Sequence, residues 1–119
     1  MVSTSSVLGI SSSMSDDLEH YQPTDCRDFL LTLNIMVSFH GDDWGGDGEL
    51  FRLTVCTPSH LYKIVLELQP AFLLSGYLVV DQYDWPTIKT MLMRQFDGIT
   101  AESTFDLMLE FSRYALYAG

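Results

Sequence analysis

Residues 29 to 40 alternate clearly between an apolar face and a face that is mostly polar. The apolar members share one face of an extended chain: Phe29, Leu31, Leu33, Ile35, Val37 and Phe39. A period of two over this length predicts a strand with one buried face. Phe51, Leu53 and Val55 repeat the pattern after a segment rich in glycine and aspartate. The two runs therefore predict a β-hairpin with a long loop, whose glycines permit positive φ angles.

The spacing of apolar residues becomes helical after the hairpin. Thr57-Pro58 suits the N-cap and first position of a helix, and the apolar residues that follow are Leu61, Ile64, Val65 and Leu68. Asp84 is the expected cap of a second helix, with Gly98 closing it. The predicted buried stripe of this second helix is Trp85, Ile88, Leu92 and Phe96. Thr100 is the expected start of a third helix, whose predicted buried face holds Phe105, Met108, Leu109, Ser112 and Leu116.

Two further strands complete the predicted order. The β-branched residues within 2–10 indicate a short edge strand, and GYLVVDQY at 76–83 indicates another. The order is β-β-β-α-β-α-α. Because a hairpin excludes a purely parallel sheet, we expect an α+β fold in which a mostly antiparallel four-stranded sheet carries three helices on one face. The length of 119 residues suits a single domain over 1–119.

The charge balance narrows the class of partner. The chain has six Lys and Arg residues and sixteen Asp and Glu residues, which gives a formal net charge of −10. A field of this sign repels nucleic acid and anionic membrane, and it attracts basic proteins or cations. We therefore predict a protein partner and neither nucleic-acid nor membrane binding.

The predictions of cellular location and of enzymatic activity rest mainly on sequence motifs that the chain does not contain. The chain has neither the basic and apolar N-terminal pattern of a signal peptide nor an apolar run of the ~20 residues that span a bilayer, so we predict a cytoplasmic protein. Cys26 and Cys56 are too few for a disulfide framework, and each is expected to act as a small hydrophobe. Cys56 and His60 lie four apart but have no obvious orienting group, which makes a thiol–imidazole pair a weak candidate. No other catalytic motif is present, so we predict no enzymatic activity and no cofactor.

The loop HGDDWGGDGE at 40–49 is the main candidate site. Its carboxylates could bind calcium, but Trp44 interrupts the ligand run and Glu49 comes too early for the EF-hand pattern. A solvated connection without a ligand is the plainest alternative. Tryptophan is, however, a frequent binding hot spot, and surrounding carboxylates suit a basic partner. We predict that the partner-binding residues are Asp42, Asp43, Trp44, Asp47 and Glu49.

A second acidic set repeats every four residues along the predicted third helix. Its members are Glu102, Asp106 and Glu110. They form a secondary candidate for partner binding, and the alternative is an ordinary solvated helix face.

Several segments together carry a family resemblance. They are DLEHYQP at 17–23, Asp28-Phe29, FRLTVCTPSHL at 51–61, GYLVVDQYDWPTIKTML at 76–92 and LMLEFSRYAL at 107–116. In this order the chain resembles the immunity-protein-eight family of bacterial polymorphic toxin systems. The resemblance implies a contact-dependent toxin immunity protein, which binds the C-terminal domain of its cognate toxin in the producing cell and blocks it.

The resemblance and the charge favour the same kind of partner. Many such toxins are nucleases with basic clefts for phosphates, and an acidic inhibitor would associate with them quickly. The alternatives are an acidic adaptor or regulatory domain with a partner that is not a toxin, a calcium- or magnesium-binding domain, and a small hydrolase that uses Cys56 and His60.

Overall fold

The computed structural model describes residues 2–41, 48–64 and 76–118. In chain order its elements are β1 (Ser3–Ser11), β2 (Leu30–His40), β3 (Glu49–Cys56), α1 (Pro58–Lys63), β4 (Tyr77–Val79), α2 (Trp85–Phe96), β5 (Thr100–Ala101), α3 (Thr104–Phe111) and β6 (Leu116–Tyr117). The α+β class and the three helices are confirmed. The predicted count of four strands is wrong, because the described residues already form a six-stranded sheet.

The predicted hairpin forms the centre of the sheet. β2 and β3 pair antiparallel, from Leu30 opposite Cys56 to Val37 opposite Glu49. All the apolar residues predicted for the inner face of β2 are buried, as are Phe51, Leu53 and Val55 of β3. The alternation therefore identified both the strands and the face that packs on the core.

The outer strands depart from the predicted pattern. The strand order is β4-β3-β2-β1-β5, with β6 pairing β3 off this path. β4 runs parallel to β3, which makes the sheet mixed. β5 and β6 have only two residues each, too few for any alternation to be read. β5 also occupies the place where we expected the third helix to begin.

β1 confirms the strand expected near residues 2–10, but the prediction that it is an edge strand is wrong, because β5 pairs with the outer side of its first residues. Polar contacts also hold this strand in place. It pairs with β2 along most of its length and with β5 through Ser3 and Thr4. The buried Ser5 hydroxyl donates to the Phe96 carbonyl at 2.6 Å and accepts from the Ile99 backbone N–H at 3.0 Å. These bonds attach the first strand to the end of α2.

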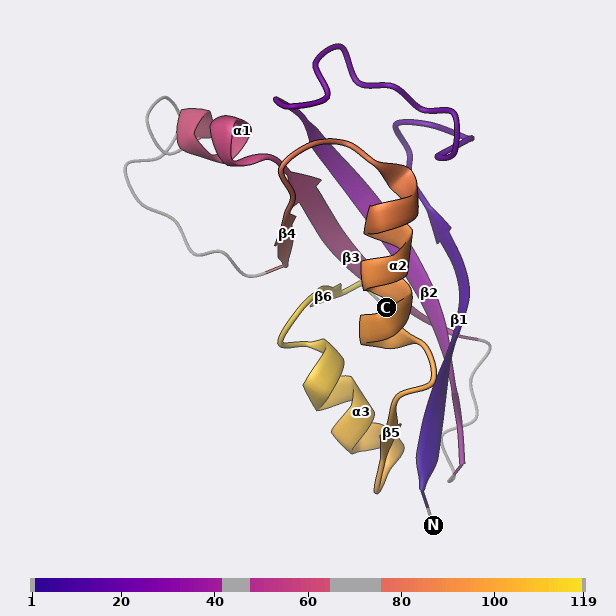
Figure 1. Ribbon diagram of the computed structural model, residues 1–119. Coiled ribbons are helices and arrows are strands. Elements are labelled where there is room, and N and C mark those ends of the chain that lie inside the picture. Colours follow the sequence, from indigo (N-terminus) through magenta and orange to yellow (C-terminus); the bar gives the residue numbers. More distant parts are fainter. Residues whose placement is uncertain (1, 42–47, 65–75, 119) are drawn as a thin grey trace.

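α2 and α3 cover the same face of the sheet, whereas α1 lies near one end of it (Figure 1). The stripe predicted for α2 is confirmed, since Trp85, Ile88, Leu92 and Phe96 are all buried. α1 is a single short segment without buried residues, and positions 65–75, which include the predicted Val65 and Leu68, lie outside the described residues. Within the described ranges, no helix has the length and apolar character needed to cross a membrane.

The buried face predicted for the third helix is wrong. α3 buries Thr104, Leu107 and Phe111, whereas Phe105 and Leu109 are 63% and 54% exposed. The helix starts four residues later than expected, with Ser103 as its N-cap. Both sets of residues have helical spacing, so periodicity alone did not distinguish the inner face from the outer one.

Candidate functional site

The primary candidate loop is described only at its end. Asp42, Asp43, Trp44 and Asp47 lie outside the described residues, and Glu49 is the first residue of β3. The Glu49 carboxylate accepts a hydrogen bond from the Tyr117 hydroxyl at 2.5 Å. This bond raises the pKa of Tyr117 above its usual value, and desolvation and the negative charge of Glu49 act in the same direction. Glu49 thus fixes the chain that follows α3 against the start of β3.

The secondary acidic set is not one continuous helical stripe. Glu102 precedes α3 and is exposed, whereas Asp106 lies in the first turn and Glu110 in the last. The Glu110 carboxylate lies 3.5 Å from the Arg113 guanidinium and accepts a 3.4 Å hydrogen bond from the Tyr114 hydroxyl. Asp106 remains exposed beside the positive end of the helix dipole, where a carboxylate is stabilised.

The two candidate sets are linked by an aromatic cluster. The Tyr117 ring, whose hydroxyl bonds Glu49, lies 5.6 Å from the Phe51 ring, and the Phe51 ring lies 5.6 Å from that of Phe111 in α3. Phe51 and Tyr117 are also opposite each other in the antiparallel pairing of β3 with β6. The structure therefore connects Glu49 to the helix that carries Asp106 and Glu110, although these residues are far apart in sequence.

The outward side of α3 is more apolar than the sequence analysis predicts. Phe105 and Leu109 lie at i and i+4, so their side chains are neighbours on the helix surface. Large apolar side chains are exposed over the rest of the described chain as well, but five of the eleven fall between residues 105 and 117: Phe105, Leu109, Tyr114, Leu116 and Tyr117. The available signal was the apolar character of this helix on more than one side, which we interpreted as a single buried face.

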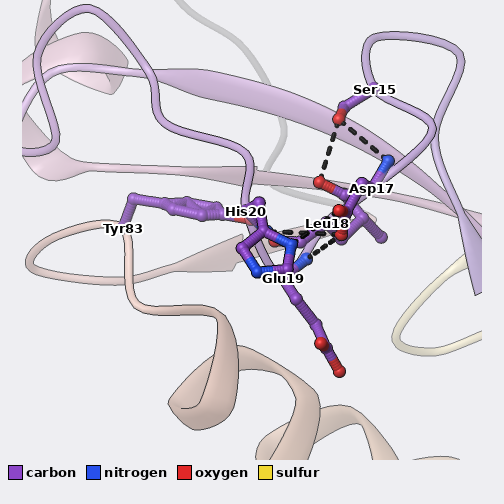
Figure 2. A network of polar contacts seen from close by, with 6 residues as sticks. All are labelled: Ser15, Asp17, Leu18, Glu19, His20 and Tyr83. Carbon is purple, nitrogen blue, oxygen red and sulfur yellow. Dashed lines mark hydrogen bonds and ion pairs between the residues drawn. The ribbon is translucent and has the colours of Figure 1, made fainter.

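A second polar region lies at the other end of the molecule. The connector between β1 and β2 is held by Asp17, which accepts hydrogen bonds from the backbone N–H groups of Glu19 and His20 at 3.2 and 3.3 Å. The His20 ring lies 2.6 Å from the same carboxylate, and the Tyr83 hydroxyl donates to the Leu18 carbonyl at 2.8 Å (Figure 2). The hydrogen bond between the His20 ring and the Asp17 carboxylate raises the pKa of His20 and lowers the pKa of Asp17.

Tyr83 brings together segments that carry the family resemblance. Its ring makes edge contacts with Tyr21 and Phe29, each at a centroid distance of 5.3 Å. Its backbone N–H donates to the Cys26 carbonyl at 2.7 Å. The motifs at 17–23 and 76–92 are therefore parts of one packed unit at this end of the sheet.

Two open hollows adjoin this unit. One has a volume of about 320 Å³ and runs from Ile10 to Glu19; the other has a volume of about 480 Å³ and extends from Glu19 to Pro86. Both are lined by Glu19 and by Trp85, whose side chain is only 8% exposed. Tryptophan at this end is thus mainly a core residue of α2 and offers little contact area.

The Cys56 and His60 pair does not form a nucleophilic site. Cys56 is fully buried, and burial raises the pKa of its thiol, whereas a reactive thiolate requires a lowered pKa. His60 instead lies 3.3 Å from the Asp28 carboxylate, which also bonds Lys63. Asp28 is the orienting group that the sequence did not reveal. The hydrogen bond from Lys63 lowers the pKa of Asp28, and His60 contributes in the same direction.

Cys26 also differs from expectation, because it is exposed rather than packed as a small hydrophobe. Among the residues described by the structure, no group of three or more His, Cys, Asp or Glu side chains is arranged to hold a metal ion. The calcium alternative concerned the 40–49 loop, most of which lies outside the described ranges.

Comparison with known proteins decides the family. The family model described as "Immunity protein 8" matches residues 7–117, from within β1 to the end of β6. The chain belongs to the immunity protein 8 family. No curated protein and no solved structure gives a significant match. Membership of the immunity protein 8 family implies an immunity protein that acts against a toxin, and such proteins are generally not enzymes.

Proposed function

We propose that this member of the immunity protein 8 family binds and neutralises a cognate toxin domain with a basic surface, a nuclease, in the cytoplasm of the producing cell. The observation that carries the proposal is the family match across residues 7–117. The net charge of −10 supports a basic partner, because opposite fields steer two proteins together and accelerate their association. Inhibition by binding requires no catalytic group in the immunity protein itself.

The proposed contact surface includes both acidic sets. The 40–49 loop would supply Trp44 as an apolar anchor and Asp42, Asp43, Asp47 and Glu49 as its charged surroundings. Glu102, Asp106 and Glu110 would add negative charge around α3. An interface of standard size buries about 800 Å² on each partner, more than one short loop provides, so participation of a second element is expected.

The decisive experiment measures binding of the purified chain to the toxin C-terminal domain encoded beside its gene. We expect a complex whose association rate falls steeply with added salt, and protection of cells that express the toxin domain. Trp44→Ala should accelerate dissociation and weaken protection, whereas the pair Asp42→Asn and Asp43→Asn should mainly slow association.

A charge-matched control shows whether the slower association comes from the position of the loop charges or only from the change in net charge. The pair Asp16→Asn and Glu19→Gln removes the same number of negative charges from exposed positions of the connector that follows β1, at the end of β2 opposite His40. If the parent chain neither binds the toxin domain nor protects against it, the proposed function is wrong. If the parent binds the toxin domain and the loop variants bind and protect as well as the parent, the loop is a connection and toxin binding uses another surface.

A further inference from the structure

α3 exposes apolar surface that the core does not use. Its inward residues Thr104, Leu107 and Phe111 are at most 1% exposed and already fill the space against the sheet. Phe105 and Leu109 nevertheless remain 63% and 54% exposed on the outer side. A surface helix normally places polar residues there. We propose that Phe105 and Leu109, here called the α3 anchor, insert into an apolar depression on a basic face of the toxin domain.

This inference rests on the proposed function and specifies one docking surface for it. Large apolar side chains at the centre of an interface contribute most of the binding free energy, while surrounding polar contacts exclude water. The α3 anchor has the required form, because two adjacent side chains on a regular helix present a preordered surface. Binding would order few additional groups, which lowers the entropic cost of association.

The charge beside the anchor identifies the chemistry of its partner. Asp106 follows Phe105 and Glu110 follows Leu109, so each apolar residue has a carboxylate as its neighbour along the helix. Glu102 adds another exposed carboxylate just before the helix. Within the described part of the chain, the cation paired with this group of carboxylates is Arg113, whose guanidinium lies 3.5 Å from Glu110. A partner with lysine or arginine around an apolar centre would complement this arrangement.

The same charges disfavour a second copy of this chain as the occupant. In a symmetric dimer formed through α3, Asp106 and Glu110 would approach the same residues of the other copy. Each copy also carries a net charge of −10. Like charges brought together at an interface oppose association, so the surface favours a basic partner of a different sequence.

The anchor is one part of a larger contact. A helix of eight residues is about 12 Å long at a rise of 1.5 Å per residue, too short to form an interface of standard size alone. Glu49 is tied to the chain after α3 through its hydrogen bond with Tyr117. The toxin domain is therefore expected to extend from α3 towards the start of β3.

The test uses the toxin C-terminal domain encoded beside the gene and a double variant, Phe105→Ser with Leu109→Ser. Both side chains are exposed, so unfolding midpoints should stay close to that of the parent. We expect the dissociation constant to rise by about a hundredfold or more, mainly through faster dissociation. The matched control is Met14→Ser with Tyr62→Ser, which removes two similarly exposed apolar side chains, 50% and 65% exposed, from the connector after β1 and from α1. It should leave the dissociation constant within about twofold, the range usual for mutations outside an interface.

A charge arm examines the chemistry of the partner. Glu102→Lys should slow association by about tenfold at low salt, more than Asp16→Lys, which makes the same charge change at the other end of the molecule. If the two variants slow association equally, the inference that a basic face of the toxin domain contacts α3 is overturned.

The remaining outcomes separate this inference from the proposed function. If the parent binds the toxin domain and the α3 double variant binds equally well, the α3 anchor is wrong while toxin binding stands. If the parent fails to bind the toxin domain, both proposals fail. If sedimentation shows a parent dimer that the α3 double variant separates into monomers, the occupant is a second copy and the inference is overturned.

Discussion

α2 and α3 pack on the same face of the sheet (Figure 1), but they differ in the residue types on their solvent-exposed sides. α2 buries one stripe, from Trp85 to Phe96, and turns mostly polar residues such as Thr87, Lys89 and Arg94 towards solvent. Its exposed large apolar residue is Met91, at 43%, against two more strongly exposed ones on α3. α3 also buries one stripe but turns Phe105 and Leu109 outwards. α2 therefore has the composition of a helix that serves the core. α3 has apolar surface in excess of what the core requires, which is the property expected of a helix that also binds a partner.

The largest effect expected from this comparison concerns two leucines of one helix. Leu107→Ala removes a side chain with no exposure and should lower the free energy of unfolding by about 2–5 kcal/mol. Leu109→Ala removes the same atoms from the outer side and should change it by no more than about 0.5 kcal/mol. Chemical denaturation of both variants measures the difference.

Leu92→Ala provides the reference in α2, since Leu92 is 2% exposed and should behave like Leu107. Comparable losses for Leu107→Ala and Leu109→Ala would contradict the assignment of Leu109 to the outer side.

A smaller effect is expected at the helix starts. The Ser103 hydroxyl accepts a 3.1 Å hydrogen bond from the Asp106 backbone N–H, so Ser103→Ala should cost about 0.5–2 kcal/mol of unfolding free energy. Asp84 occupies the N-cap of α2 without a side-chain bond to the helix backbone. Asp84→Ala should therefore cost less, about 0.5 kcal/mol or below.

The outcome can again be read from unfolding midpoints, with both variants measured under the same conditions. A larger loss for Asp84→Ala than for Ser103→Ala would show that the caps contribute in the reverse order.

The smallest effect concerns the chain that leaves α3. The hydrogen bond to Glu49 raises the pKa of Tyr117, so the protonated phenol is favoured in the folded protein. The associated stability is fully present below the unfolded tyrosine pKa of about 10 and is lost as the pH rises through the higher folded value. Glu49→Gln should lower the pKa of Tyr117 towards its usual value. Spectrophotometric titration of tyrosinate, with Tyr117→Phe as the reference that identifies this residue, measures the shift.

Sequence patterns predicted those elements in which one face is plainly apolar and the other plainly polar. The inner face of β2 and the stripe of α2 are examples, since burial there follows directly from the period. Prediction failed where local pattern carried no information about partners. β5 and β6 are two residues long and exist because distant strands accept them. The parallel pairing of β4 likewise depends on the path of the chain and not on the composition of the strand.

The site was less accessible to prediction for a related reason. Glu49 was chosen for its carboxylate, but its hydrogen bond to Tyr117 joins residues 68 positions apart. Phe105 and Leu109 were recognised as an apolar stripe and placed on the wrong side, because Thr104, a polar residue, occupies an inner position. The Thr104 hydroxyl is accommodated there by the Ser3 hydroxyl at 3.1 Å, a contact that no local pattern can indicate.

The bond between Ser3 and Thr104 has a consequence for how the protein is made. It joins residues 101 positions apart, and β1 has its outer neighbour in β5, at residues 100 and 101. During synthesis β1, β2 and β3 can pair once residue 56 has left the ribosome, because each lies beside its neighbour in the chain. The contacts of Ser3 and Thr4 with β5 and α3 form only after residues 100–104 have emerged. α3 docks at that same stage, so a nascent chain would gain the α3 anchor only after residues 104–111 have emerged and packed on a sheet that is already formed.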